Sequence, residues 1–470
     1  MGTIMSTVPT GFFEERESTV PSSDLNVELF RTVSRFPPFE SITNGELFSL
    51  CLKNKTSTLT HGLHRFAGKY IPQIPAWALQ QFSTKDFVVL DPFSGSGTTL
   101  VEGLRSCRES IGIDCDPLAC LIAKAKTEIV NPEEISSLGQ RIREVWEPST
   151  TPLEPPMLGL VNFSHWFGEA TWGHLQSLRS TIVGLECSEE ARRFLLCVFS
   201  SILRRVSNAD DQTQKTYVSG TLKKSPPPTV PTFWNAFDRA LLGLRDLDRL
   251  RLPHARSRVI QGDAANIDLP EGYVDLMVTS PPYLDSVDYM YNFMLEYFWL
   301  GPLFGVGDRK VFNEMRRGVI GAKNPQKSTS TPLHLPSCLD DLISEGDILH
   351  SRQLATRRYC LDMANHFASA AKVLKPQGRY VLVVGNSQTK KGVLPIHDAL
   401  IRLAADAGLA FEKAFAYRIR RHYMKFPRKG RGGIITMDWV VVLRKTDGGT
   451  AYPPRLPLPA FTLRDDEVAN

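Results

Sequence analysis

The clearest pattern along the chain is a series of short apolar runs that each end in acidic or glycine-rich residues. Residues 86–104 read D-F-V-V-L-D-P-F-S-G-S-G-T-T-L-V-E-G-L, where a buried-strand run meets a glycine turn and then a helical pattern. Further apolar runs lie within 108–117, 257–265 and 274–278. Because strand, helix and strand alternate at this spacing, we predict an α/β fold with a doubly wound, Rossmann-like and mostly parallel sheet.

The C-terminal third continues this alternation and then changes character. Residues 352–373 have helical periodicity, and a strand pattern resumes over 379–384. Two further strand patterns, 410–419 and 434–443, predict a closing antiparallel hairpin.

Breaks in these patterns divide the chain into seven segments. They are an N-terminal arm and helical lead-in (1–60), the first half of the core (61–131), a largely helical insert (132–253), a core segment containing T-S-P-P-Y (254–300), a loop insert (301–351), the second half of the core (352–445) and a disordered tail (446–470). Inserts this long in an α/β domain are usually functional.

Composition excludes several classes of protein. The chain has 470 residues, and its 55 Lys and Arg barely exceed its 50 Asp and Glu, so a nucleic-acid-binding surface would have to be local. The eight cysteines form no C-x-x-C pair, which predicts neither a metal site nor a disulfide framework. No secretory signal or membrane-spanning run is present, so we expect a cytoplasmic protein with no membrane partner.

The glycine turn and two acids predict a nucleotide-like ligand. A turn such as F-S-G-S-G brings backbone N–H groups to a helix N-terminus, although it is not the G-x-G-x-x-G of dinucleotide sites. Asp114 lies 19 residues after Gly95, where a ribose-binding carboxylate is expected, and Asp263 can accept from an adenine amine. S-adenosylmethionine contains ribose, amine and adenine. The alternative is an ordinary tight turn, with Asp114 and Asp116 as helix caps.

Residues 279–283, T-S-P-P-Y, directly follow an apolar strand run. Proline lacks an N–H and has a fixed φ, so the strand has to stop here and its carbonyls remain free of ladder hydrogen bonds. The sequence therefore predicts a rigid edge with available acceptors.

Four stretches in this order, D-P-F-S-G-S-G-T-T, G-I-D-C-D-P, G-D-A-A and T-S-P-P-Y, resemble the amino-methyltransferases that modify exocyclic nitrogens of DNA, particularly the cytosine-N4 enzymes. Residues 64–72 resemble the segment that covers the methionine end of the cofactor in that family, and 373–387 resemble its fifth-strand region. The resemblance spans roughly 63–443, apart from the two inserts.

The resemblance implies roles for individual residues. It places Asp91 and the loop from Phe93 to Gly97 at the methionine part of S-adenosylmethionine, Asp114 at the ribose and Asp263 at the adenine. The full implied cofactor set is Lys69, Asp91, Pro92, Phe93, Ser94, Gly95, Ser96, Gly97, Thr98, Asp114, Asp263 and Ala264, and the implied catalytic set is Ser280, Pro281, Pro282 and Tyr283.

In the catalytic set, the Ser280 hydroxyl and the Pro281 carbonyl would accept from the amine, while Tyr283 would stack on a base flipped out of the duplex. In that family, the position of Ser280 is usually Asp or Asn in the adenine-N6 enzymes and Ser in the cytosine-N4 enzymes. We therefore expect a site-specific cytosine-N4 DNA methyltransferase from a restriction-modification system, acting on double-stranded DNA beside a separate cognate endonuclease. The alternatives are an adenine-N6 DNA enzyme, an RNA guanine-N2 enzyme and a non-catalytic DNA-binding relative.

Basic residues indicate where DNA would bind. The stretch 418–431, R-I-R-R-H-Y-M-K-F-P-R-K-G-R, contains no acid, and a solvated hairpin tip is the alternative interpretation. Its predicted DNA contacts are Arg420, Arg421, Lys425, Arg428, Lys429 and Arg431. The inserts add Arg204, Arg205, Lys215, Lys223 and Lys224, or Arg309, Lys310, Arg316, Arg317 and Lys323, and the sequence does not decide which insert reads bases. For His61 and His64 we expect structural roles.

Overall fold

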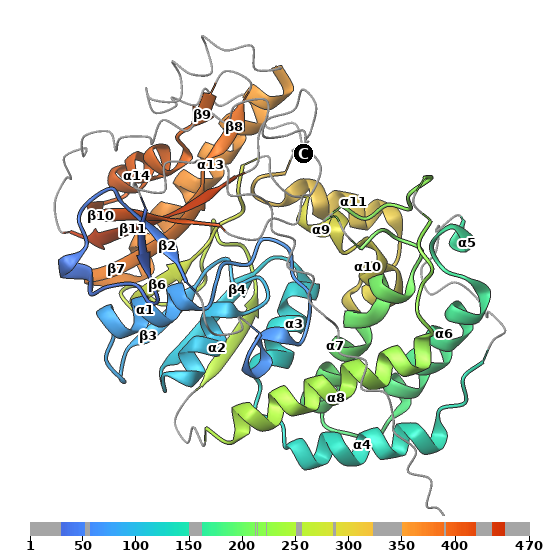
Figure 1. Ribbon diagram of the computed structural model, residues 1–470. Helices are drawn as coiled ribbons and strands as arrows, with labels where there is room; N and C mark the ends of the chain where they lie inside the picture. Colours follow the sequence, from blue (N-terminus) through green and yellow to red (C-terminus); the bar gives the residue numbers. More distant parts are fainter. Residues whose placement is uncertain are drawn as a thin grey trace, which may run out of the picture.

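A computed structural model describes residues 30–51, 57–149, 162–211, 213, 215–221, 223–250, 256–284, 288–322, 350–389, 392–419 and 435–446. Its centre is a nine-stranded sheet in the order β1-β2-β10-β11-β7-β6-β3-β4-β5 (Figure 1). The strands are β1 (Arg31–Val33), β2 (Glu46–Leu50), β3 (Val88–Asp91), β4 (Glu109–Asp114), β5 (Ser257–Gln261), β6 (Val274–Thr279), β7 (Leu374–Gly385), β10 (Leu409–Arg418) and β11 (Met437–Lys445), with β8 (Ser387–Thr389) and β9 (Gly392–Leu394) forming a separate pair.

Pairing in the sheet confirms the predicted doubly wound fold. Strands β5, β4, β3, β6 and β7 run parallel, each beside the next. Strands β10 and β11 form the predicted antiparallel hairpin, and β11 also pairs antiparallel with β7. The carboxyl ends of β3, β4, β5 and β6 therefore meet at one edge of the sheet, where ligands bind in open α/β folds.

The helices cover both faces of the sheet and extend beyond one end of it. They are α1 (Gln73–Phe82), α2 (Thr98–Arg105), α3 (Pro117–Thr127), α4 (Pro132–Val145), α5 (Phe163–Trp166), α6 (Glu169–Gly184), α7 (Glu189–Val206), α8 (Thr229–Asp248), α9 (Tyr289–Asn292), α10 (Met294–Leu300), α11 (Arg309–Gly318), α13 (His350–Val373) and α14 (Ile396–Asp406). Apolar side chains of α13 and α14 form one core with the sheet, and those of α1 form another.

The N-terminal segment differs from the predicted arm and helical lead-in. Residues 31–33 and 46–50 are strands that extend the sheet beyond β10, and β2 pairs parallel with β10. Burial alternates along β2: Phe48 and Leu50 are buried, whereas Leu47 and Ser49 are less buried. This pairing joins residues about 370 positions apart in the chain, as between Glu46 and Phe415, so local pattern could not reveal it.

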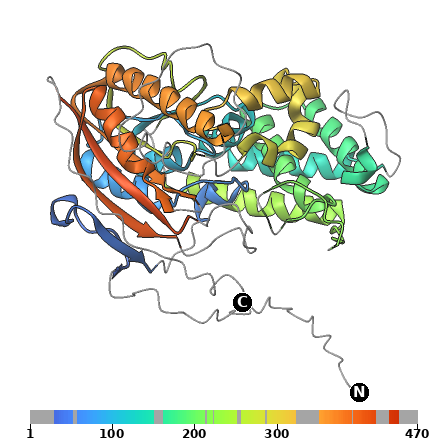
Figure 2. The same cartoon turned by 90° about the horizontal axis from the view of Figure 1, so that it is seen from above.

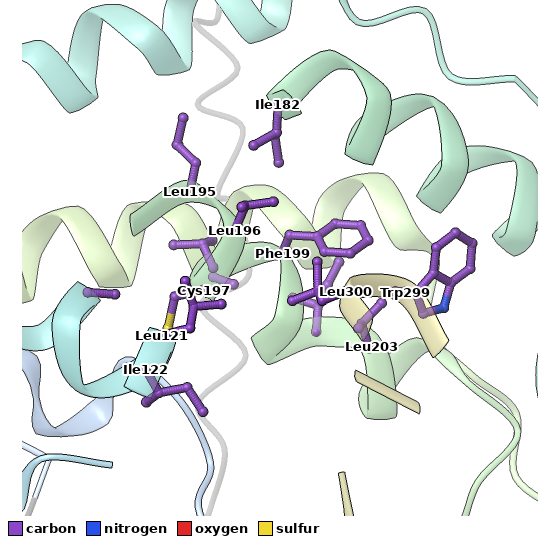
Figure 3. Close-up of a cluster of buried hydrophobic side chains, with 14 of the residues drawn as sticks. Leu121, Ile122, Ile182, Leu195, Leu196, Cys197, Phe199, Leu203, Trp299 and Leu300 are labelled. Carbon is purple, nitrogen blue, oxygen red and sulfur yellow. The ribbon is translucent and has the colours of Figure 1, made fainter. Parts of the chain in front are cut away.

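The insert 132–253 is largely helical, as its pattern indicates, and it gathers with α9, α10 and α11 at one end of the sheet (Figures 1 and 2). Its core packs Phe199 and Leu203 of α7 around Trp299 and Leu300 of α10 (Figure 3). Helix α10 packs with the helical insert although it lies within 254–300, and the expected loop insert 301–351 begins with a 3₁₀ turn and α11.

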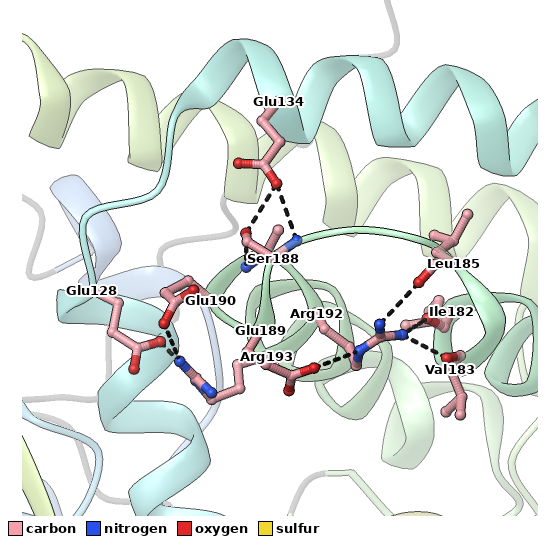
Figure 4. A network of polar contacts seen from close by, with 11 residues as sticks. Glu128, Glu134, Ile182, Val183, Leu185, Ser188, Glu189, Glu190, Arg192 and Arg193 are labelled. Carbon is pink, nitrogen blue, oxygen red and sulfur yellow. Dashed lines mark hydrogen bonds and ion pairs between the residues drawn. The ribbon is translucent and has the colours of Figure 1, made fainter.

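Polar contacts join the helices of this region to one another and tie α7 to the end of α3. Arg193 of α7 pairs with Glu128, the residue after α3, and with Glu190, both at 2.8 Å (Figure 4). Arg192 donates to carbonyls at the end of α6, including that of Leu185 at 2.9 Å. Ser188 donates to Glu134 of α4 at 2.9 Å. These contacts join α4 and α6 to the start of α7, and Arg193 joins α7 to the end of α3.

Candidate functional site

The glycine turn between β3 and α2 has the geometry that the sequence predicts. Gly95 and Gly97 have φ of +48° and +78°, a region that residues with a side chain rarely adopt. A Cβ at Gly95 would lie 3.1 Å from the Phe66 ring, so the segment predicted to cover the cofactor does lie on the turn. Ser96 Oγ is buried without a hydrogen-bond partner among the described residues, which fits a turn built to receive a polar ligand.

Asp114 and Asp116 have different roles, although both end the same strand. Asp116 caps α3 by accepting from Leu118 and Ala119, and it also accepts from the Tyr297 hydroxyl at 2.6 Å. The cap alternative is therefore correct for Asp116. Asp114 instead accepts from the Gly95 N–H at 2.8 Å and from the Asp116 N–H at 2.9 Å. Burial and the Asp116 charge raise the pKa of Asp114 to about 7.

The raised pKa gives a testable pH dependence. Between its ordinary value and about 7, Asp114 binds a proton more tightly in the folded chain than in the unfolded chain, so stability is lost as pH rises through that interval. The difference in the free energy of unfolding, Asp114→Asn minus wild type, is therefore expected to be larger at pH 8 than at pH 5. The increase should be at least the roughly 1.4 kcal/mol that corresponds to one pKa unit. Urea unfolding at both pH values measures this. An equal difference at the two pH values would contradict the shift.

Asp263 and Ala264 lie beyond the end of β5, beside His366 of α13. Asp263 is exposed, and one of its oxygens accepts from the Ala265 N–H at 2.9 Å. The Ala264 carbonyl accepts from His366 Nδ1 at 2.8 Å, so His366 Nε2 accepts in turn from a tyrosine hydroxyl. Burial lowers the pKa of His366 to about 4, and its ring lies 4.7 Å from that of Phe93. The sequence contained no signal for His366, because it lies about 100 residues from Ala264.

Asp91 is buried and accepts hydrogen bonds from two other elements, which its sequence position does not indicate. Its two oxygens accept from Thr279 and Thr99, each at 2.5 Å, and the Tyr70 hydroxyl bonds in turn to Thr99. Only 1% of Asp91 is exposed, and burial raises its pKa to about 6. The carboxylate thereby joins β3, α2 and the last residue of β6, directly before Ser280. Its predicted contact with the methionine part of the cofactor stays a prediction.

The T-S-P-P-Y stretch ends β6 at Thr279, as predicted from its prolines. Ser280 Oγ is buried without a well-formed hydrogen bond among the described residues, and the Tyr283 side chain lies close enough to interact with it. The Tyr283 hydroxyl donates to Asp438 of β11 at 2.8 Å. The stretch thus places a hydroxyl with acceptor capacity beside a tethered aromatic ring.

The lead-in before the glycine turn has mainly structural polar contacts. His61 Nε2 bonds to Glu102 at 2.8 Å, and His64 Nε2 bonds to Ser200 at 3.0 Å, both buried. Burial lowers the pKa of His64 to about 4. These contacts agree with the expected structural roles. Lys69 is an exposed residue, but its Nζ is partly buried, donates to the His61 carbonyl at 3.2 Å, and has its pKa lowered by burial. Its cofactor contact stays a prediction.

The basic residues of the helical insert separate into two groups. Arg204 is buried and donates to carbonyls of the following loop, and Lys224 donates to the Arg204 carbonyl at 2.9 Å. Both are structural, which corrects their proposed use in DNA binding. Arg205, Lys215 and Lys223 are exposed.

The other predicted DNA contacts lie mostly outside the described residues. These are Arg420, Arg421, Lys425, Arg428, Lys429 and Arg431, and also Lys323. In α11, by contrast, Arg309, Lys310 and Arg317 are exposed, while Arg316 pairs with Asp288 at 2.7 Å.

Two further properties concern only the described part of the chain. There, no group of three or more His, Cys, Asp or Glu side chains could hold a metal ion. No helix within it is long and apolar enough to cross a membrane.

Comparison with known proteins indicates the same class as the motifs. Residues 53–125 match the N6/N4 methyltransferase family, described as DNA methylase. Type II methyltransferase M.MvaI from Kocuria varians is 28% identical over 406 residues, covering 80% of this chain and 86% of that protein. Type II methyltransferase M.BsoBI from Geobacillus stearothermophilus is 22% identical, covering 78% of this chain and 82% of that protein.

Among solved structures, a TehB-like SAM-dependent methyltransferase from Corynebacterium glutamicum is 10% identical, with a TM-score of 0.26, and covers 79% of this chain and 87% of that one. Together with the sheet topology and the site, the sequence matches support an S-adenosylmethionine-dependent DNA methyltransferase of the N6/N4 kind. They do not distinguish the cytosine amine from the adenine amine.

Proposed function

We propose that this protein methylates the exocyclic N4 amine of a cytosine flipped out of duplex DNA, with S-adenosylmethionine as the donor. The observation that carries the proposal is Ser280, whose buried Oγ has no well-formed hydrogen bond and lies at the end of β6 beside Tyr283. A hydroxyl in this place can accept from an amine N–H without carrying a charge. Bound S-adenosylmethionine supplies a methyl group on a sulfonium, which reacts with a nucleophile without metal assistance.

Polar groups at the carboxyl ends of the strands would hold the cofactor. Asp114 would bind the ribose, Asp263 and Ala264 the adenine, and the turn from Phe93 to Gly97 the methionine part. The Ser96 hydroxyl, which has no partner in the described part of the chain, and the start of α2 give this turn polar groups for such a ligand.

Ser280, Pro281 and Tyr283 would act on the base. The lone pair of a cytosine N4 amine is delocalised into the ring, so acceptors held against its N–H groups are needed to make the nitrogen nucleophilic. Preorganised polar groups of this kind lower the barrier because they need no rearrangement during reaction. Extruding a base costs a few kcal/mol, and stacking on one aromatic ring returns about 1–3 kcal/mol, so we expect Tyr283 to matter for turnover.

Adenine-N6 methylation is the alternative, because the matched family includes both amines. Ser280 favours cytosine, since a serine hydroxyl replaces the Asp or Asn of the adenine enzymes. The relatives named as Type II methyltransferases support the further proposal that this protein is the modification half of a restriction-modification system. Its cognate endonuclease would be a separate protein.

The proposal of DNA as substrate is tested by following labelled methyl groups. The purified full chain is incubated with labelled S-adenosylmethionine and either unmethylated duplex DNA or transfer RNA. We expect the label in DNA. Label in transfer RNA alone would overturn the DNA assignment and favour the RNA guanine-N2 alternative.

We also propose that α11 contacts the DNA backbone close to the base site. The helix is fixed beside α9, which follows T-S-P-P-Y, because Arg316 pairs with Asp288, the N-cap of α9, and lies 5.0 Å from the Tyr291 ring. Lys310 and Arg317 remain exposed on it. Phosphate contacts by such residues give affinity without base selectivity.

The double variant Lys310→Ala/Arg317→Ala is expected to weaken DNA binding and to reduce the slope of log affinity against log salt by about 1 to 2. Turnover at saturating DNA should change little. Fluorescence-anisotropy titrations at several salt concentrations measure the DNA affinity and its salt dependence. The matched control is Lys85→Ala/Arg258→Ala, which removes two exposed charges near the opposite ends of β3 and β5. Equal effects of the two double variants would exclude α11 as a specific contact.

A further inference from the structure

The Tyr283 side chain is tethered by a buried carboxylate that also binds a second tyrosine. Tyr283 donates to Asp438 Oδ1 at 2.8 Å, and Tyr417 donates to Asp438 Oδ2 at 2.8 Å. Asp438 is only 7% exposed, and no ion pair to it occurs among the described residues. Both of its oxygens are thus occupied by phenol hydroxyls.

Three strands build the seat on which the Tyr283 ring lies. Tyr417 of β10 is the cross-strand neighbour of Asp438 in β11, and Asp438 is in turn the neighbour of Gly385 at the end of β7. A Cβ at Gly385 would lie 2.8 Å from Tyr283 Cε2, so only a glycine leaves room for the ring there. The tether and the gap together define one position for the ring.

A carboxylate in this place has a cost for the fold. Burial raises the pKa of Asp438, and the two tyrosine hydroxyls only partly oppose that shift. An apolar residue would avoid the desolvation of a charge. The arrangement does have a benefit for binding, because a ring already fixed in place loses little conformational freedom when a base stacks on it.

We propose that Asp438 and Tyr417 are positioning residues that hold Tyr283 in the orientation in which it stacks on the extruded base. This inference rests on the proposed function, because it assumes that Tyr283 contacts the base. It does not depend on whether that base is cytosine or adenine. The hydroxyl of Tyr283 serves as the anchor and its ring as the contact surface.

A double-mutant cycle on kcat/KM for duplex DNA tests the proposal. Tyr283→Phe keeps the ring and removes the anchor, whereas Asp438→Asn removes the carboxylate. Each is expected to lower kcat/KM about 3- to 10-fold, the size expected from ordering one side chain, and to leave S-adenosylmethionine affinity within about twofold. Because Asp438 acts through Tyr283, the kcat/KM of the double variant should be no lower than that of the less active single variant.

A purely structural carboxylate would give a different cycle, in which Asp438→Asn lowers activity as much in the Tyr283→Phe protein as in wild type. That result, or full activity of Tyr283→Phe, overturns the proposal. Tyr417→Phe provides a milder second variant if Asp438→Asn fails to fold, and it should show the same dependence on Tyr283. The matched control is Tyr273→Phe, because the Tyr273 hydroxyl bonds to Glu109 at the opposite edge of the sheet.

Failure of the proposed function is recognisable in the same experiment. A wild-type protein that transfers no methyl group to DNA overturns both the function and the inference. An active wild-type protein whose variants follow the structural pattern overturns the inference alone.

Discussion

Ser280→Ala is expected to reduce kcat on DNA about 100-fold while leaving S-adenosylmethionine affinity within about twofold. The size follows from the loss of one preorganised polar group at the reacting centre. The Ser280 Oγ has no well-formed hydrogen bond among the described residues, so its removal leaves no buried partner group unsatisfied. Single-turnover kinetics, together with calorimetric titration of the cofactor, separate the two effects.

A second buried serine provides the control for this substitution. Ser110 of β4 also has a buried Oγ for which the described residues provide no hydrogen-bond partner, but it lies in the interior of the sheet. Ser110→Ala is expected to leave kcat unchanged. If Ser280→Ala retained wild-type turnover, the hydroxyl would have no part in activating the amine.

Asp91→Ala is expected to lower the free energy of unfolding by about 2 to 5 kcal/mol. The substitution removes the acceptor of the buried Thr279 hydroxyl and of the Phe93 N–H, whereas Thr99 keeps the Val278 carbonyl as an acceptor. Each lost acceptor costs about 1–3 kcal/mol. The turnover of the remaining folded protein should also fall, because Thr279 directly precedes Ser280. Urea unfolding and kcat at low temperature measure the two consequences.

Asp275→Ala distinguishes a local from a general effect of losing a bridging carboxylate. Asp275 of β6 accepts from the Val88 N–H of β3 at 2.9 Å and pairs with Lys375 of β7 at 2.6 Å, so it too joins separate elements of the core. It lies near the opposite ends of these strands. We expect Asp275→Ala to reduce stability while retaining kcat. Equal losses of kcat in both variants would mean that Asp91 has no special connection with the base site.

Much of the core could be predicted because its signals are local in sequence. The strand run before Asp91, the glycines at 95 and 97 and the prolines at 281 and 282 each restrict the backbone by themselves. Their order along the chain then places the strand ends at one edge, because parallel strands joined by helices all point the same way. The structure confirms this part of the prediction.

The missing parts depend on contacts between residues far apart in the chain. Asp438 and Gly385 act on Tyr283 from more than 100 positions away, and neither has a local motif. The N-terminal strands were missed for the same reason, since β2 finds its partner in β10. Arg204 was misjudged because its charge is visible in the sequence, whereas the carbonyls that surround it are not.

Identification of the methylated nucleoside shows which amine receives the methyl group. Unmethylated duplex DNA is treated with the purified protein and S-adenosylmethionine, digested to nucleosides and measured by mass spectrometry. Ser280 at the end of β6 predicts N4-methylcytosine as the product. N6-methyladenine as the sole methylated nucleoside would contradict that assignment.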